Sequence, residues 1–375
     1  PGGIVHLFKF RAFGTFLSLC RVQPVFLFQF TGDLLAAKLP RLETVEVVEE
    51  PIPKPGKGEV LIQMKASALC RSDLHRYHGT QIFDEDESAC YITPGHEPCG
   101  VVAELGEGVT KVKVGDRVAL YLGLGCGVCP HCLRGDVMLC KKFRCIGFAV
   151  NGAHADYMTI PEENCLPMPD EMDYITGALS TDVGGTLYTA CKRLGLNGTK
   201  SVVIIGCGPM GSGGILMAKG FGAKVIAVDT DEKRLAMARE LGADETLNPM
   251  KVDGVAETIR LTDGLGADAA IVTAGGNIPL NSALNSVRAQ GQVALIAESN
   301  SATIDPSNQF LRKLVELKGC WYFNRSDWEE ISSFIVNNHI ELKKIASHTF
   351  PISEAAKAFP MFDSGETQKV VFVWD

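Results

Sequence analysis

The stretch from Ser201 to Asp229 constrains the fold of this 375-residue chain more than any other. Its apolar run 202–205 is typical of a strand buried on both faces. Gly-Cys-Gly-Pro-Met-Gly follows at once, then a helix-like segment, then a second apolar run, 225–228, that ends at Asp229. G-x-G-x-x-G between a strand and a helix, with an acid about 20 residues further on, indicates a dinucleotide site. The stretch therefore predicts a strand–helix–strand unit of a parallel sheet.

This fingerprint also predicts which groups bind the dinucleotide. Its glycines let the backbone approach a pyrophosphate, and the helix N-terminus adds free N–H groups. Asp229 can accept hydrogen bonds from both ribose hydroxyls of NAD and would repel the extra phosphate of NADP. We expect NAD, although Lys233 and Arg234 leave NADP open and Asp229 could instead cap a helix. The expected cofactor-binding residues here are Gly206, Gly208, Pro209, Met210, Gly211, Asp229 and Arg234.

Helices and strands alternate beyond the fingerprint. Helices are expected at 232–241, 254–261 and 327–337 and from 351, and strands at 269–273, 292–297, 317–323 and 369–374. Such alternation favours a doubly wound parallel sheet. The last segments should return to the first half of the chain, because the sheet is complete before them.

The first half of the chain has a different pattern. Short strands punctuated by glycine are expected at 44–48, 59–66, 101–105 and near 115–118, which is typical of a compact antiparallel barrel or sandwich. Residues 1–33 carry seven phenylalanines, but Arg21 and Pro24 interrupt the apolar run and no convincing cleavage site follows. We expect residues 1–33 to be a poorly ordered extension outside the fold, or residues translated from upstream of the real start, with no membrane role.

Charge and cysteine content narrow the function. The formal net charge of -8 gives no reason to expect nucleic acid as a partner. Thirteen cysteines are an odd number, and several are clustered. This pattern favours metal thiolates over a disulfide framework, and therefore a reducing compartment, the cytoplasm.

Four cysteines with the spacing C-x2-C-x2-C-x7-C form the clearest metal motif. Four thiolates fill a tetrahedron and leave no open position, so the expected ion is a structural zinc. An iron–sulfur cluster uses the same ligands, and a zinc ribbon for nucleic acid would carry a more basic surface. The expected ligands are Cys126, Cys129, Cys132 and Cys140.

A second metal site is expected between Cys70 and Gly100. Cys70 and His96 offer a thiolate and an imidazole that only a folded chain can bring together, as at a catalytic zinc with an open position. Taken singly, Cys70 could be a core cysteine and His96 a turn histidine. The cysteine cluster and the dinucleotide fingerprint together favour the metal.

Three signatures in this order resemble the zinc-dependent alcohol dehydrogenases of the medium-chain dehydrogenase/reductase superfamily. They are Gly95-His96-Glu97 with Gly100, Gly106 and Val109 behind it, the four-cysteine motif, and the fingerprint. The resemblance covers about residues 34–375. It implies an α/β protein with a GroES-like, β-rich catalytic domain at 34–182, completed by 324–375, and a Rossmann cofactor domain at 183–323.

The resemblance also implies site residues. Cys70, His96 and Asp182 would bind the catalytic zinc, and Asp182 departs from the cysteine of many members, which puts the substrate in doubt. Without the resemblance, Asp182 would be a helix N-cap. Glu97 would neighbour the metal. The remaining implied cofactor contacts are Arg71 and Lys369 near the pyrophosphate, and Thr186 and Met210 near the nicotinamide.

The implied chemistry is hydride transfer between an alcohol, or a carbonyl in reverse, and NAD. Zinc would lower the pKa of the alcohol, Ser72 would accept its proton, and the ribose hydroxyls and His75 would relay that proton to solvent. A polyol or sugar-alcohol dehydrogenase is the alternative within this chemistry. A zinc-free reductase or a structural protein on the same fold is the alternative of another class. Two zinc ions per chain and a homo-oligomer, a dimer or tetramer, are expected.

Overall fold

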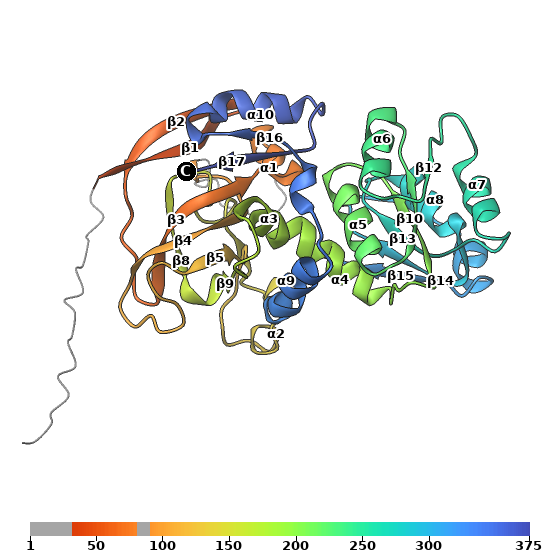
Figure 1. Ribbon diagram of the computed structural model, residues 1–375, viewed down its shortest axis with the longest axis horizontal. Helices are drawn as coiled ribbons and strands as arrows, with labels where there is room; N and C mark the ends of the chain where they lie inside the picture. The colour runs from red at the N-terminus through yellow and green to blue at the C-terminus, as the bar shows by residue number, and fades with distance from the viewer. Residues whose placement is uncertain (1–31, 81–90) are drawn as a thin grey trace, which may run out of the picture. The chain divides into compact units, whose positions relative to one another are not determined.

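The computed structural model describes residues 32–80 and 91–375. The predicted extension 1–33 lies outside this part, apart from Gly32 and Asp33, and Asp33 already begins the first strand. Two large sheets organise the described residues, one parallel and one mainly antiparallel (Figure 1). No helix in the described ranges is long and apolar enough to cross a membrane.

The parallel sheet has six strands in the order β12-β11-β10-β13-β14-β15. All five strand pairs are parallel, which confirms the doubly wound sheet expected from the alternation. The order reverses between β10 and β13, where ligands bind at the carboxyl ends of strands in such sheets. The strands are β10 (Ser201–Ile205), β11 (Lys224–Val228), β12 (Glu245–Leu247), β13 (Ala267–Val272), β14 (Val287–Leu295) and β15 (Glu316–Gly319).

Helices pack against this sheet as expected for crossover connections. α5 lies against β10 and β11, and α8 lies against β13 and β14 (Figure 1). The strand expected at 317–323 ends early, at Gly319, and Tyr322 has a positive φ of 53° that a strand does not allow. The helices of this half are α5 (Pro209–Gly220), α6 (Glu232–Glu240), α7 (Gly254–Leu261), α8 (Asn277–Ser286) and η5 (Pro306–Leu311).

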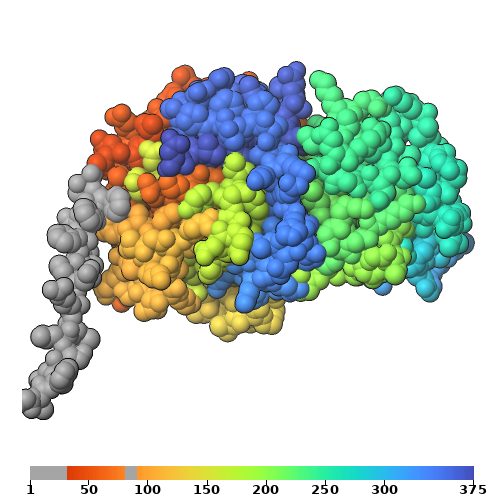
Figure 2. Space-filling model, in the orientation of Figure 1, coloured from red at the N-terminus to blue at the C-terminus, as the bar shows by residue number. Residues whose placement is uncertain are grey.

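The second sheet has seven strands and combines strands of the first half of the chain with the last two strands, β16 and β17. Its main path is β16-β17-β3-β4-β5-β9, with β8 paired to β3. β17 pairs antiparallel with β3, so the last strand returns to the first half as expected (Figure 2). The strands are β3 (Glu59–Ala68), β4 (Glu97–Leu105), β5 (Arg117–Leu120), β8 (Tyr157–Pro161), β9 (Cys165–Pro167), β16 (Ala346–Phe350) and β17 (Lys369–Val373).

Smaller elements complete this half. The hairpin of β1 (Asp33–Arg41) and β2 (Thr44–Pro51) is antiparallel, and α10 (Ala355–Asp363) packs on β2 and β17. The strand β1 was not predicted. The remaining elements are α1 (Arg71–Tyr77), β6 (Gly123–Leu124), α2 (Pro130–Leu133), η2 (Val137–Leu139), β7 (Arg144–Cys145), η3 (Glu162–Asn164), η6 (Arg325–Asp327), α9 (Trp328–Asn337), η7 (Leu342–Ile345) and η8 (Ile352–Glu354).

One helical run connects the two sheets. α3 (Tyr174–Leu179), the π-helix η4 (Ser180–Gly184) and α4 (Gly185–Arg193) follow one another without a break. The largest buried apolar cluster contains Ala66 of β3, Leu179 of α3 and Ile204 of β10. The predicted domain boundary at 182/183 therefore falls inside this run, and the boundaries stay predictions.

Candidate active site

Cys70 and His96 are positioned by the ends of two adjacent strands. β3 delivers the chain to Cys70, the N-cap of α1, and its N–H donates to Asp73 Oδ2 at 2.8 Å. His96 comes directly before β4, which pairs with β3. Gly95, with φ 101°, lets the chain turn there, since an added Cβ would lie 2.5 Å from His154 Nδ1.

Asp182 reaches the same point from the π-helix η4. Its Oδ2 lies 3.7 Å from Cys70 Sγ and 3.9 Å from His96 Nε2, and its Oδ1 accepts from Thr186 Oγ1 at 3.2 Å. π-helical turns are rare in proteins overall, but those that occur are often found at functional sites. Asp182 lies inside a helical run, so it is not a helix N-cap, which was the alternative interpretation.

These side chains fit a divalent metal. One ligand atom from each of Cys70, His96, Glu97 and Asp182 lies within 4.8 Å of the others. Tetrahedral zinc with bonds of about 2.0–2.3 Å separates its ligands by roughly 3.5 Å, close to the two separations given for Asp182. Glu97 Oε2 is buried and has no hydrogen-bond partner within the described residues. A cation would satisfy that oxygen.

Charge behind the cluster favours the thiolate. Lys369, from β17, is buried, and its Nζ donates to Leu69 O at 3.1 Å and to Glu97 Oε1. Burial alone would raise the pKa of Cys70, but Lys369 and His96 lower it below its usual value. Burial alone would lower the pKa of Lys369, and the surrounding Cys70 and Glu97 raise it. The Lys369 ammonium was expected near the pyrophosphate. In the structure it contacts Glu97 Oε1.

Asp73 orients the cluster and was not predicted. It is fully buried, and its Oδ1 lies 3.2 Å from His96 Nδ1. Burial would raise the pKa of Asp73, but the attraction of His96 and its hydrogen bond lower it to about 2. Metal-binding histidines usually donate their second N–H to such a carboxylate. Asp73 could have been found from its position three residues after Cys70, which is the spacing of a capping box.

Ser72 and His75 lie one turn apart on α1. Ser72 Oγ is 3.2 Å from His96 Nε2, beside the cluster. His75 is exposed, and its Nδ1 pairs with Thr80 Oγ1 at 2.8 Å. Both line the cleft described below. The structure thus places a hydroxyl at the metal ligands and an imidazole at the solvent side.

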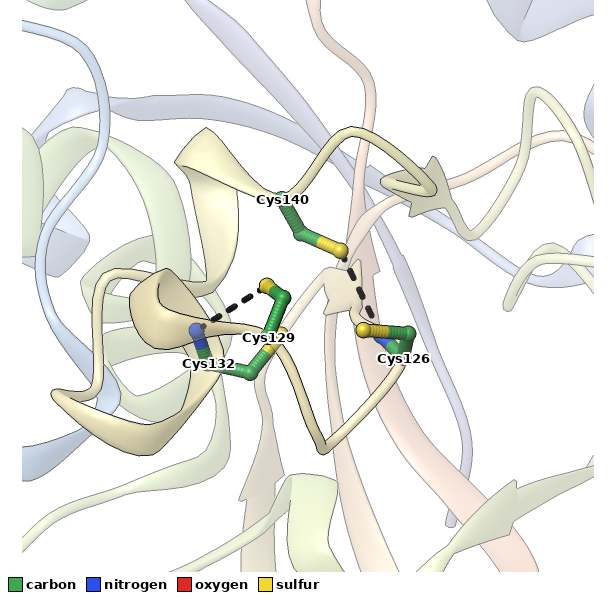
Figure 3. Close-up of side chains that lie close together, drawn as sticks. All are labelled: Cys126, Cys129, Cys132 and Cys140. Carbon is green, nitrogen blue, oxygen red and sulfur yellow. Dashed lines mark hydrogen bonds between the residues drawn. The ribbon is translucent and has the colours of Figure 1, made fainter.

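The four cysteines of the C-x2-C-x2-C-x7-C motif converge in a separate lobe (Figure 3). Cys129 Sγ accepts from Cys132 N at 3.5 Å, and Cys140 Sγ accepts from Cys126 N at 3.4 Å. N–H groups of Val128 and Cys129 lower the pKa of Cys126 to about 6. A thiolate at neutral pH is what a metal requires, so this lobe also fits a tetrahedral ion.

A cleft of about 450 Å³ joins the catalytic cluster to the fingerprint. Gly211 packs tightly, since an added Cβ would lie 1.8 Å from Gly206 O. At Gly208, the N-cap of α5, an added Cβ would meet nothing within 4 Å. The loop therefore leaves open space at the helix N-terminus, where a pyrophosphate would bind. Pro209 and Met210 line the same cleft.

Asp229 anchors the fingerprint loop. Its Oδ2 accepts from Cys207 N at 2.7 Å and its Oδ1 from Asp231 N at 2.9 Å. Asp231, and not Asp229, caps α6. Arg234 Nη1 lies 3.9 Å from Asp229 Oδ2, and both residues line the cleft.

The remaining expected contacts also line the cleft. Arg71 lies near the turn before β17, because a Cβ added to Gly365 would be 3.7 Å from Arg71 Nη2. Thr186 lines the cleft beside Asp182. Thr273, Glu298 and Tyr322 were missed, although residues after parallel strands are the ones that meet a ligand.

Two family models match this chain. The family model for the alcohol dehydrogenase GroES-like domain matches residues 56–170, and the model for zinc-binding dehydrogenases matches 209–337. The expected GroES-like and Rossmann domains are thus confirmed.

Relatives match along nearly their whole length. L-threonine 3-dehydrogenase of Bacillus subtilis (strain 168) is 32% identical over 330 residues, 87% of this chain and 94% of that protein. The solved 2R,3R-butanediol dehydrogenase from Bacillus subtilis has 28% identity and a TM-score of 0.83, covering 91% and 100% of the chains. An alcohol dehydrogenase from Thermus sp. ATN1 has 27% identity and a TM-score of 0.83, covering 90% and 99%. The chain belongs to the zinc-binding alcohol dehydrogenases of the medium-chain dehydrogenase/reductase superfamily and is an oxidoreductase of that family.

Proposed function

We propose that this protein is a zinc-dependent alcohol dehydrogenase that uses NAD. One observation carries the proposal: a single cleft is lined by Cys70 and Asp182 of the candidate metal cluster and by Gly208 and Asp229 of the fingerprint. A hydroxyl held at the cluster would therefore lie in the same cavity as the cofactor.

The proton route is built from α1. When bound, zinc stabilises an alkoxide relative to its alcohol, and the nicotinamide accepts the hydride. Ser72 lies beside the cluster and accepts the substrate proton as it releases its own hydroxyl proton toward solvent. His75, one turn further along α1 and exposed, passes that proton to solvent. Lys369 holds Glu97 behind the cluster.

NAD is the proposed cofactor because Asp229 lies in the cleft where the ribose hydroxyls would bind. A carboxylate accepts those hydroxyls and repels the 2′-phosphate of NADP. Lys233 and Arg234 favour NADP, but the Arg234 guanidinium lies 3.9 Å from Asp229 Oδ2, which offsets part of its charge.

The substrate class is a secondary alcohol or the matching carbonyl. The names of two relatives point to hydroxyls of this type, on threonine and on butanediol. A polyol or sugar alcohol is the second candidate, favoured by a carboxylate, Asp182, where many family members have cysteine.

A substrate panel tests the reaction. Secondary alcohols, polyols and aldehydes are offered with NAD and with NADP, and the absorbance of the reduced cofactor is followed. We expect turnover of at least one alcohol with NAD and much slower turnover with NADP. No oxidation of any alcohol would refute the proposal.

Metal analysis separates this proposal from a zinc-free reductase or a structural protein. We propose two zinc ions per chain, one catalytic and one in the four-cysteine lobe. Near zero zinc would favour the zinc-free alternative, and iron in the cysteine lobe would favour an iron–sulfur cluster.

We also propose a homo-oligomer, a dimer or tetramer, in the cytoplasm. β15 is an edge strand of the parallel sheet, and an unpaired edge is a template for a second copy. All eleven described cysteines are free, as a reducing compartment requires. Light scattering tests the oligomeric state.

A further inference from the structure

Two cavities share one wall at the carboxyl ends of β14 and β15. Residues 296–298 and 320–322 line both the catalytic cleft and a second cavity of about 680 Å³. The second cavity extends toward the four-cysteine lobe, where Met138 and Leu139 line it, and toward Arg193 of α4. A substrate whose reacting hydroxyl lies at the metal cluster can therefore place its far end along this wall.

Glu298 gives the wall a negative charge. Its side chain is exposed, and within the described residues its carboxylate has no hydrogen bond or ion pair. Three basic side chains line the catalytic cleft: Arg234 is near Asp229, Lys369 contacts Glu97, and Arg71 lies near Gly365. On the second cavity's side, Arg193 Nη1 donates to Gly319 O and to Cys320 Sγ. Among the described residues, none of these basic groups lies within ion-pair distance of Glu298.

Two aromatic residues line the same wall as this carboxylate. Trp321 is 41% exposed, and its ring centroid lies 5.1 Å from that of Tyr322. Burial raises the pKa of Tyr322, and nearby acidic groups, among them Asp182 and Glu298, raise it further. Tyr322 is therefore a neutral ring close to Glu298 and to the metal cluster. Its positive φ of 53° is a backbone conformation that a bulky residue rarely adopts.

A carboxylate next to aromatic faces is a recognition site for an organic cation. Ring faces attract an ammonium group, and the carboxylate supplies the full counter-charge. A substrate carboxylate would instead be repelled at Glu298.

We propose that the preferred substrate is an alcohol that carries a positively charged amine beyond the reacting carbon, and that Glu298 is the residue that selects it. This inference rests on the proposed alcohol oxidation and names its substrate class. Glu298 acts on binding of the distal group and takes no part in proton or hydride transfer.

The test compares cationic alcohols with neutral ones of the same shape. Amino-2-alkanols with one to four methylenes between the amine and the carbinol carbon are assayed with NAD at pH 7, where the amine is protonated. Their neutral partners are 2-alkanols of matched length. We expect kcat/KM about three- to tenfold higher for the best amine than for its neutral partner in wild type, and a ratio of the two kcat/KM values close to one in Glu298→Gln.

Glu240→Gln is the matched control. Glu240 is an exposed carboxylate at the end of α6 that lines neither cavity, so the variant has the same charge change and should keep the preference. Raising the ionic strength should weaken the preference in wild type but have little effect in Glu298→Gln.

Two outcomes overturn the inference. One is a wild-type enzyme that oxidises neutral alcohols or polyols as well as the amines. The other is a Glu298→Gln variant that keeps the preference for amines. If no alcohol is oxidised, the proposed function fails instead, and calorimetric titration with tetramethylammonium chloride, which cannot bind a metal, tests the cation site alone. Equal or absent heats for wild type and Glu298→Gln would then refute it.

Discussion

Replacing Asp73 with asparagine tests how the catalytic cluster is held. Asp73 accepts from Cys70 N through Oδ2 at 2.8 Å and pairs with His96 Nδ1 through Oδ1 at 3.2 Å. Asparagine has the same shape but only one acceptor oxygen. Its NH2 group must face one of these two donors.

The cost can be estimated from this geometry. A buried donor left without an acceptor costs about 1–3 kcal/mol. Loss of the carboxylate behind a metal-binding histidine typically weakens metal binding about 10- to 100-fold, or about 1.4–2.7 kcal/mol. We therefore expect the dissociation constant of the catalytic zinc to rise by that factor, and kcat to fall.

Competition with a chromophoric chelator measures both zinc ions of each chain. The ion in the four-cysteine lobe is an internal control, because Asp73 lies outside that lobe. Asp170→Asn, on the surface, is the matched control variant. Equal affinity of wild type and Asp73→Asn for both ions would refute the orienting role of Asp73.

Three further predictions follow from the same structure. Ser72→Ala should lower kcat about 100- to 10,000-fold with unchanged zinc content; a change of only a few-fold in steady-state assays would exclude Ser72 from proton transfer. Asp229→Asn should raise the KM for NAD about tenfold and reduce the preference for NAD over NADP. Cofactor titrations that show no change would indicate that the ribose binds elsewhere. His154 is buried, and burial lowers its pKa to about 4. Between about pH 6.5 and pH 4, the imidazole is therefore protonated in the unfolded chain and neutral in the folded chain. Stability from His154 is therefore present at pH 7 and lost as the pH falls, by about 2 kcal/mol at pH 5. In urea unfolding, the drop in the free energy of unfolding from pH 7 to pH 5 should be smaller by that amount in His154→Asn than in wild type. An identical drop in both proteins would contradict this role of His154.

Local patterns in the sequence predicted the fold. The apolar runs at 202–205 and 225–228 and the glycines between them specify a strand–helix–strand unit within about 30 residues, and the structure confirms it. The spacing of the cysteine motif is equally local, and all four thiols converge as expected. The family was identified from these signatures and is confirmed by the comparisons.

Long-range features of the candidate site could not be predicted in this way. Lys369 contacts Glu97 because β17 pairs with β3, and nothing near residue 369 signals that partner. Asp182 is presented by a π-helical turn, which has no sequence pattern of its own. Glu298 and Tyr322 follow different strands and line the same cavities because β14 and β15 are adjacent. The roles of the individual site residues stay predictions.

An anomalous difference map at the zinc absorption edge, from crystals grown without added metal, tests the central claim most directly. We predict one peak between Cys70 Sγ, His96 Nε2 and Asp182 Oδ2, and a second peak among the four cysteines of the lobe. A cluster without a peak in crystals whose cysteine lobe is fully occupied would contradict the account.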